Sequence, residues 1–407
     1  MRISSAQYFT MNVSSMSDQQ AQLSQLYQEL SSGVSLATPS DNPLGAAQAV
    51  QLSTTATTLS QYTTNQSTAL SSLQAEDSTL GSVNSVLQSI HTLVLRAGDG
   101  SLNNGDRGSL ATQLTSLRSQ LMTLANSTDA QGNYLFAGYQ SQSQPYSTNS
   151  AGAVTYSGDA GAPSVQVTDS HNVQTGDNGT SIFNSVSAIG TSAVPAGSSS
   201  NTGTGVIGTV SLNNPTDPTN ADTYALNFTS STTYTISQTD PATGTTTVGG
   251  PQAFSSGTAI TLGGQSVTIS GQPNAGDSFS VTPATQGSMD VFANLSQLIT
   301  TLQTPISSGS TTANYQSALT TSMTQLENTM NNVVTAQAAV GGRETEVQAL
   351  QTVTQTNTLQ TSSNLADLTQ VDMVKTIGQY TLEQNALQAA QQAFVKIQSV
   401  SLFQYLS

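Results

Sequence analysis

The chain has 407 residues, of which only 7% are charged, against about 25% in ordinary globular domains. The formal net charge is −15 and the few basic residues are scattered, which excludes a nucleic-acid-binding surface with clustered Lys and Arg. Cysteine is absent, so disulfides and thiol chemistry are excluded. No apolar run reaches the ~20 residues of a membrane span, and a membrane partner is not expected.

The length suggests roughly two to four domains. Long helices faced with neutral amides and hydroxyls suit a crowded polymer, in which charges would be costly to desolvate. A partly disordered, low-complexity chain is the alternative, and the regular apolar periodicity described below favours the polymer. The first residues, MRISSAQYFTMNVSS, lack the apolar core of a secretory signal peptide, so we expect any export to use another route.

The first predicted element is a helix that runs from residue 1 to about residue 30, with Gly33 placed to cap its end. Apolar residues recur along it in steps of three and four, with Gln20 filling one missing step. This N-terminal stripe consists of Phe9, Val13, Met16, Leu23, Tyr27 and Leu30. A single helix does not bury such a stripe, so the stripe predicts a partner helix.

Two further helices are predicted next. Ser40 or Asp41 is expected to cap a helix that has Pro43 in its first turn and runs to about Ala97. A Gly-Asp-Gly break follows at residues 98–100, and leucines then recur from Leu110 to Leu124. This arrangement predicts an antiparallel helical hairpin.

The composition changes after residue 128. Residues 128–140 combine turn residues with a Tyr-Leu-Phe run, which predicts a β-hairpin or a short strand pair. From there to about Gly287, short β-like runs alternate with Gly, Pro, Asn and Asp. This pattern predicts an all-β insertion, divided near residues 190–205, which we expect to be flexible.

Helix returns at Met289 and leads to Pro305, and a second long helix follows that either continues or hinges near residues 365–368. The terminal helix carries an apolar stripe that also includes Gln384 and Ala390. We expect both terminal stripes to pack against other subunits; the ordinary core of a monomeric bundle is the alternative, which the shortage of large apolar residues disfavours. The C-terminal packing residues are Met373, Ile377, Tyr380, Leu387, Phe394, Ile397, Leu402 and Phe403.

The predicted fold class is α+β, with long N- and C-terminal helices that form a helical bundle or coiled coil around an inserted all-β region. Residues 1–40 and 371–407 are predicted to form a terminal coiled-coil (axial) domain, and residues 41–140 and 288–370 a helical core domain. Residues 141–189 are predicted to form a β segment that adjoins the core, and residues 190–287 an inserted β domain.

No catalytic, cofactor-binding or metal-binding constellation is recognisable, so no enzymatic activity is expected. His91 and His171 lie outside any His-Glu-x-x-His pattern, so a zinc site has no ligands. The carboxylate pairs Glu76-Asp77 and Glu344/Glu346 are interpreted as ordinary helix residues rather than as an acid–base pair. Asp177-Asn178-Gly179 is interpreted as a turn, because the later bidentate Glu of a calcium loop is missing.

Several segments resemble the flagellin superfamily. MRISSAQYF, PSDNPLGAAQAV, NLADLTQVDM and LQAAQQAFVKIQSVSLFQYL are similar to its hook–filament junction family, hook-associated protein 3, and GNYLFAGYQ and VGGRETEVQAL are shared more broadly with flagellins. The resemblance covers roughly residues 1–140 and 313–407. It implies that paired terminal helices line the central channel of a tubular assembly. It also implies that the unfolded chain is exported through the flagellar channel without a cleaved signal peptide.

The resemblance implies a structural adaptor outside the cell, at the hook–filament junction of the flagellum. Its expected partners are further copies of itself in a ring, the neighbouring hook-associated protein, flagellin and a cytoplasmic export chaperone. A minor flagellin of the filament and a surface adhesin are the alternatives. The ending SLFQYLS favours the junction family over flagellin. The even spread of Tyr and Phe over the β insertion disfavours an adhesin.

Overall fold

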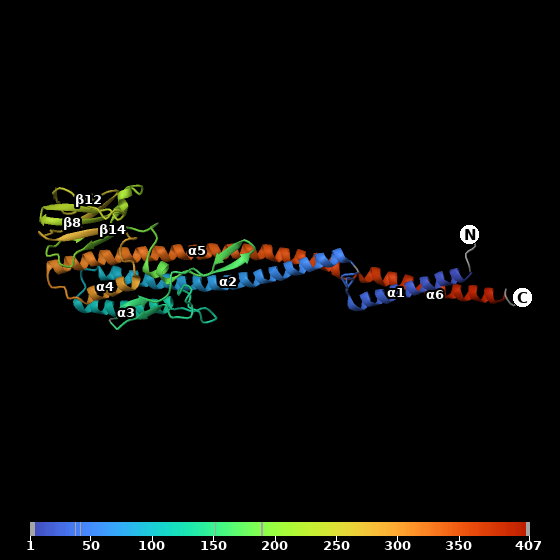
Figure 1. Cartoon of the computed structure of the whole chain (residues 1–407). Coiled ribbons are helices and arrows are strands. Elements are labelled where there is room, and N and C mark those ends of the chain that lie inside the picture. The colour runs from blue at the N-terminus through green and yellow to red at the C-terminus, as the bar shows by residue number, and fades with distance from the viewer. Residues whose placement is uncertain (1–4, 37, 41, 151, 189, 404–407) are drawn as a thin grey trace. The chain divides into compact units, whose positions relative to one another are not determined.

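The computed structural model of the chain describes residues 5–36, 38–40, 42–150, 152–188 and 190–403, and gives only the backbone for residues 5, 6, 8, 310 and 397–403. The chain divides into two compact units. Unit 1 comprises residues 1–64 and 351–407, and unit 2 comprises residues 65–350. The long helices α2 (Pro43–Ala97) and α5 (Gly309–Thr369) contribute to both units (Figure 1).

Unit 1 begins with helix α1 (Ser5–Ser32), which ends where the sequence predicts. Gly33 has a φ of 71°, a conformation that favours glycine, and its N–H donates to the carbonyl of Glu29 at 2.8 Å. The predicted cap of α2 is wrong. The Asn42 side-chain oxygen accepts the Gly45 N–H at 3.0 Å, so Asn42 rather than Ser40 caps this helix, and Asp41 lies outside the described residues.

The long C-terminal helix breaks a few residues later than the predicted hinge. Helix α5 runs to Thr369, and helix α6 (Met373–Phe403) follows after a three-residue gap. An antiparallel bridge joins Val34 to Gln370 beside this break, and the Ser35 N–H donates to the Thr369 carbonyl at 2.9 Å. The Asp372 carboxylate then accepts the Lys375 N–H at 3.1 Å and caps α6. The break is therefore tied to the chain that leaves α1.

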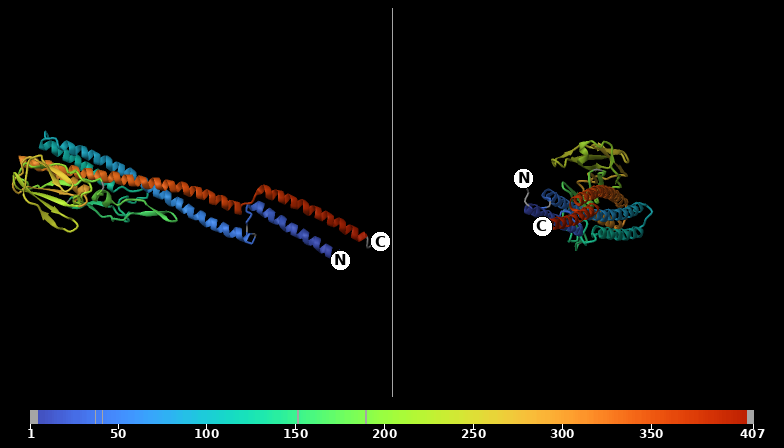
Figure 2. Two further views of the ribbon diagram at one scale, coloured as in Figure 1. Left: turned by 90° about the horizontal axis from the view of Figure 1, so that it is seen from above. Right: turned by 90° about the vertical axis from the view of Figure 1, so that its right-hand side faces the viewer.

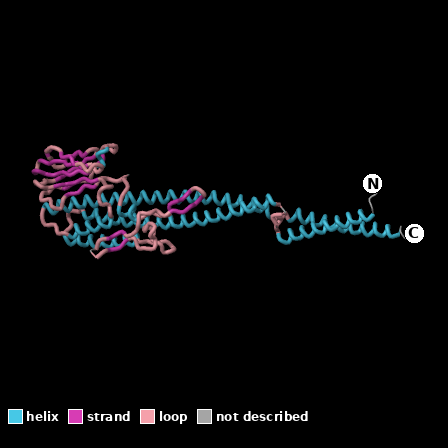
Figure 3. The backbone as a smooth tube through the Cα atoms, viewed as in Figure 1, coloured by secondary structure: helices cyan, strands magenta, loops and turns pink. Residues whose placement is uncertain are grey.

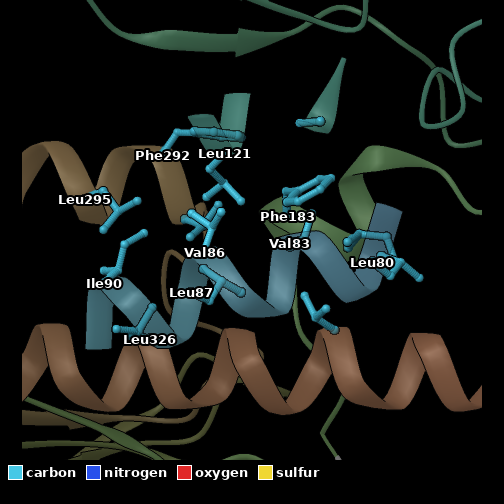
Figure 4. Close-up of a cluster of buried hydrophobic side chains, with 14 of the residues drawn as sticks. Leu80, Val83, Val86, Leu87, Ile90, Leu121, Phe183, Phe292, Leu295 and Leu326 are labelled. Carbon is cyan, nitrogen blue, oxygen red and sulfur yellow. The ribbon is translucent and has the colours of Figure 1, made fainter. Parts of the chain in front are cut away.

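The helical part of unit 2 consists of α2, α3 (Asn104–Ala125), α4 (Val291–Gln303) and α5. The predicted leucine stripes form its core, because Leu80 and Leu87 of α2 and Leu121 of α3 are fully buried. Figure 4 shows the α2 side chains between Leu326 of α5 on one side and the α3 and α4 side chains on the other. The helical hairpin predicted around the Gly-Asp-Gly break is confirmed by this packing.

The strand pair predicted for residues 128–140 is not formed. The segment consists of turns with one isolated bridge between Thr128 and Tyr134, because Phe136 points into the helical core and is fully buried. Its ring packs edge-on against Phe183 with 5.4 Å between centroids. Phe183 belongs to a short π-helical turn, Thr180–Asn184.

Two small antiparallel hairpins lie between this segment and the π-helical turn. The first pairs β1 (Tyr146–Thr148) with β2 (Val154–Tyr156), and the second pairs β3 (Ser164–Thr168) with β4 (His171–Gln174) (Figure 3). Tyr146 of β1 and Val167 of β3 are fully buried in the helical core. Each hairpin is therefore attached to the helices of unit 2 by its inward-facing side chains.

The remaining strands form two antiparallel sheets around a second hydrophobic core. The larger sheet has the order β10-β9-β8-β14-β5, with β11 also pairing with β9, and the smaller has the order β12-β13-β6, with β7 also pairing with β13. Inward side chains alternate along β8, where Tyr224, Leu226 and Phe228 are buried. The strands are β5 (Val194–Gly197), β6 (Val206–Ile207), β7 (Ser211–Leu212), β8 (Thr223–Ser230), β9 (Thr233–Thr239), β10 (Thr246–Val248), β11 (Gln252–Ala253), β12 (Ala259–Leu262), β13 (Gln265–Ser270) and β14 (Ser278–Thr282).

The expectation that residues 190–205 are a flexible divider is wrong. The segment supplies strand β5, and side chains of α5 bind its main chain. Asn328 exchanges two hydrogen bonds of 2.8 Å with the backbone of Ser192, and the Thr321 hydroxyl donates to the carbonyl of Pro195 at 2.7 Å. A Cβ at Gly197 would lie 3.1 Å from the Cβ of Ser317, so glycine permits this close approach. The β insertion is therefore fixed to α5.

Candidate assembly surface

Helices α1 and α6 lie side by side and antiparallel in unit 1 (Figures 1 and 2). The rings of Phe9 and Phe394 are in contact at one end, with 5.2 Å between centroids. The bridge between Val34 and Gln370 lies just beyond the other end of the pair. These two contacts set the register of the pair, so residues near the middle of α1 lie level with residues near the middle of α6.

The seam between the two helices follows the alternating steps of three and four residues of a coiled coil. In α1 the half-buried seam positions are Asn12, Met16, Gln19, Leu23, Leu26 and Leu30. In α6 the buried and half-buried seam positions are Thr376, Tyr380, Glu383, Leu387, Ala390 and Phe394. Several seam positions are polar, so this pair buries little apolar surface by itself.

The predicted packing residues divide into two groups. Seven of them lie in the seam: Phe9, Met16, Leu23, Leu30, Tyr380, Leu387 and Phe394, although Phe9 remains 48% exposed at its end. Four others lie outside it and are between 44% and 65% exposed: Val13, Tyr27, Met373 and Ile377. The side chains of Ile397, Leu402 and Phe403 lie outside the described residues.

The seam within the chain differs from the predicted stripes by one position at alternate steps. The seam passes through Gln19 and Leu26 where the sequence pattern suggested Gln20 and Tyr27. Thr376 and Glu383 likewise take the places expected for Ile377 and Gln384. Adjacent positions on a helix both fit an apolar period of three and four, and only the partner helix selects between them. The three-residue step from Leu23 to Leu26 was the available sequence signal that Leu26, rather than Tyr27, lies in the seam.

Further apolar side chains of the coil, absent from the predicted stripes, are also exposed. Met11 of α1 and Val374, Leu382 and Val395 of α6 are 60%, 85%, 67% and 63% exposed. Few charges accompany them: Asp18 and Glu29 in α1, and Lys375, Glu383 and Lys396 in α6. Covering this surface would therefore desolvate much apolar area and few ions.

Unit 1 as a whole lacks the kind of core that unit 2 has. Among its described residues the buried side chains are those of Thr354, Thr361 and Thr376, and none is a hydrophobic one. Most of the exposed large hydrophobic side chains that the structure describes belong to this unit, Leu44 and Leu359 among them. Burying such a side chain contributes about 1.5–3 kcal/mol. Unit 1 is thus a set of helices whose apolar faces are exposed, and binding of a partner would stabilise them.

The described residues offer little for other chemistry. They contain no group of three or more His, Asp or Glu arranged to hold a metal ion. His91 lies 3.8 Å from a carboxylate oxygen of Glu327, and His171 lies 2.7 Å from one of Glu346. Within the part of the chain that the structure describes, no helix has the length and apolar character needed to cross a membrane.

Comparison with known proteins shows that the chain is similar to proteins of the flagellum. Residues 3–141 match the family model of the bacterial flagellin N-terminal helical region. The chain is 27% identical over 406 residues to flagellar hook-associated protein 3 of Salmonella typhimurium, with 99% of each chain covered. It is also 27% identical over 405 residues to the Escherichia coli protein of the same name, again with 99% of each covered.

Solved structures show the same similarity to hook-associated protein 3. The crystal structure of hook-associated protein 3 from Legionella pneumophila has 26% sequence identity and a TM-score of 0.68, over 78% of this chain and 98% of that one. FlgL from Xanthomonas campestris has 25% identity and a TM-score of 0.65, over 73% of this chain and 97% of that one. The predicted resemblance to hook-associated protein 3 and the flagellin-like α+β fold class are both confirmed.

Proposed function

We propose that this chain is a structural subunit of the bacterial flagellum, the adaptor that joins the hook region to the filament. The similarity to hook-associated protein 3 spans the whole chain, including both terminal helices. The main support for a role in assembly comes from unit 1. Its described residues bury no hydrophobic side chain, while many such side chains remain exposed. Such helices become stable when neighbouring subunits cover them.

The subunits form a ring in which the exposed residues Phe9, Val13, Tyr27, Met373 and Ile377 pack against adjacent copies. The seam residues hold α1 and α6 together within each copy, and the paired helices keep these exposed side chains in fixed positions relative to one another. Ile397, Leu402 and Phe403 belong to the same proposed set of packing residues. One rim of the ring meets the neighbouring hook-associated protein, and the other meets flagellin.

Each of the four predicted parts of the chain forms a separate part of the subunit. Residues 1–40 and 371–407 form the axial domain, and residues 41–140 and 288–370 form the helical core domain. Residues 141–189 form the β segment that adjoins this core, and residues 190–287 form the inserted β domain. The protein is not an enzyme, binds neither nucleic acid nor membrane, and reaches the extracellular flagellum through the flagellar export channel with the help of a cytoplasmic chaperone.

The substitution Tyr27→Asp tests the packing role. Tyr27 is 65% exposed, so an aspartate there should leave the isolated chain folded. In the assembly it places an unpaired charge in an apolar contact, which costs several kcal/mol per subunit. Cells carrying the variant should therefore shed flagellin into the medium and lose motility. The neighbouring exposed residue supplies a matched control, Gln28→Asp, which should retain filaments.

The position of labelled protein on isolated flagella tests the adaptor role separately. An adaptor appears as one narrow band between the hook and the filament. Label distributed along the filament would identify a minor flagellin and overturn the proposal. Normal swimming of the Tyr27→Asp strain would instead show that this face of α1 does not pack against adjacent subunits.

A further inference from the structure

The hairpin formed by β3 and β4, with the loop that continues to Asp177, lies across helices α2 and α5 in unit 2 (Figure 1). We refer to residues 164–177 as the clasp. Two amide side chains of α2 bind its main chain: Asn65 donates to the carbonyl of Gln166 at 2.7 Å and Gln66 donates to that of Val167 at 2.8 Å. The side chain of Val167 is fully buried beneath it.

Helix α5 holds the other side of the clasp. The imidazole of His171 lies 2.7 Å from a carboxylate oxygen of Glu346. The guanidinium of Arg343 lies 2.6 Å from the carboxylate of Asp177 and also donates to the carbonyl of Gln174 at 3.5 Å. The clasp is thus bound to both long helices, mainly by polar contacts.

One group beneath the clasp lacks a counter-ion of its own. The side chain of Glu76, on α2, is only 1% exposed. Its Oε1 atom accepts the backbone N–H of Asp177 at 3.0 Å, while its Oε2 atom is enclosed without a hydrogen-bond partner. The only nearby cation, among the described residues that face Glu76, is Arg343, and its hydrogen bond goes to Asp177.

The surrounding charges are mostly negative. Burial and the neighbouring carboxylate of Asp177 raise the pKa of Glu76 to about 8, against smaller opposing effects of the Asp177 N–H and of Arg343. Elsewhere between the two helices, burial and Asp77 of α2 also raise the pKa of Glu344 of α5. The carboxyl groups of Glu76 on α2 and of Asp177 in the clasp therefore lie beside a single guanidinium, that of Arg343, which pairs with Asp177.

We propose that residues 164–177 form a pH-dependent clasp, closed over α2 and α5 while Glu76 is protonated and opened when Glu76 ionises. A neutral carboxyl group tolerates enclosure and still accepts the Asp177 N–H through Oε1. An ionised one beside Asp177 is both desolvated and repelled, and only opening of the clasp returns it to water. The contacts on the α5 side do not offset this cost of ionising Glu76, because the guanidinium of Arg343 already pairs with Asp177.

Opening the clasp changes what the helices expose. Ala69 and Leu73 of α2 are fully buried in the same hydrophobic cluster as Val167 and Val173 of the clasp. Lifting the hairpin uncovers these side chains and removes the polar contacts by which the clasp joins α2 to α5. A subunit in contact with the medium thereby acquires a local response to alkaline pH that leaves the rest of the core of unit 2 in place.

Hydrogen exchange of the full chain between pH 6 and pH 9, corrected for intrinsic amide exchange, tests the clasp directly. Because Glu76 binds its proton more tightly in the closed state, the opening constant of residues 164–177 should rise on the order of tenfold to a hundredfold over this range. The hairpin of β1 and β2 serves as the internal reference and should not change. Glu76→Gln, which does not titrate, should keep the clasp protected at pH 9.

Glu327→Gln is the matched control, because Glu327 is more than half exposed, and this variant should follow the wild type. An equal rise in Glu76→Gln and wild type, or no rise in the wild type, overturns the proposal. The carboxyl carbon resonance of Glu76 provides a second measurement that needs no variant. A titration midpoint near 8 supports the clasp, and a midpoint near the ordinary 4.5 of a glutamate refutes it.

Discussion

Replacing Glu76 by Gln removes one buried ionisable group and little else. The two side chains have nearly the same shape, and the Gln carbonyl oxygen takes over the hydrogen bond from the Asp177 N–H. Any stability that the substitution adds therefore measures the cost of keeping a carboxyl group at this position. That cost depends on pH in a way that the structure specifies.

The pKa of Glu76 is raised from 4.5 to about 8 in the folded protein, mainly by burial. The folded state therefore binds this proton more tightly than the unfolded state does. Its stabilising effect is complete below pH 4.5 and is lost as the pH rises toward 8. At about 1.4 kcal/mol for each unit of pKa, the loss amounts to at most about 5 kcal/mol, and opening of the clasp reduces it by returning the carboxylate to water.

Urea unfolding at constant ionic strength, followed by circular dichroism from pH 4.5 to pH 8.5, measures this difference. Glu76→Gln should match the wild type near pH 4.5 and exceed it by several kcal/mol at pH 8. The exposed control Glu327→Gln should stay within about 0.5 kcal/mol of the wild type throughout. A gain for Glu76→Gln that is the same at every pH would refute the electrostatic reasoning and leave only a packing effect.

Asn332→Ala should destabilise unit 2 by about 2–3 kcal/mol, because this amide makes four hydrogen bonds to the backbone of residues 181–187. Thermal unfolding checks this against Asn331→Ala, which loses one exposed bond and should cost less than about 1 kcal/mol. Phe394→Asp removes the ring contact with Phe9 and should separate α1 from α6 and abolish filament attachment; retained motility would contradict it. Limited proteolysis of the isolated wild-type chain should cleave within residues 1–40 and 371–407 first, and equal resistance along the chain would contradict the absence of a hydrophobic core in unit 1.

The sequence by itself determined the elements whose signal is local and redundant. The leucine stripes of α2 and α3 repeat over many turns, so an error at one position would not have altered the prediction of a core. The strands of the β insertion were predictable for the same reason, since inward and outward residues alternate along β8. The end of α1 depended on one residue, Gly33, but on one whose backbone freedom suits that position. The family resemblance rested on terminal segments and was confirmed by full-length similarity.

The tertiary structure alone decided the features that depend on distant partners. Leu26 and Tyr27 both fit the period of α1, and only the path of α6 places the first in the seam and the second outside it. Residues 190–205 have the composition of a flexible linker, yet Asn328 and Thr321 of α5 hold them in a sheet. Glu76 has an unremarkable sequence context, and its raised pKa arises because the fold buries it beside Asp177, a residue 101 positions away. In each case the local sequence allows several environments, and burial against a distant segment selects one of them.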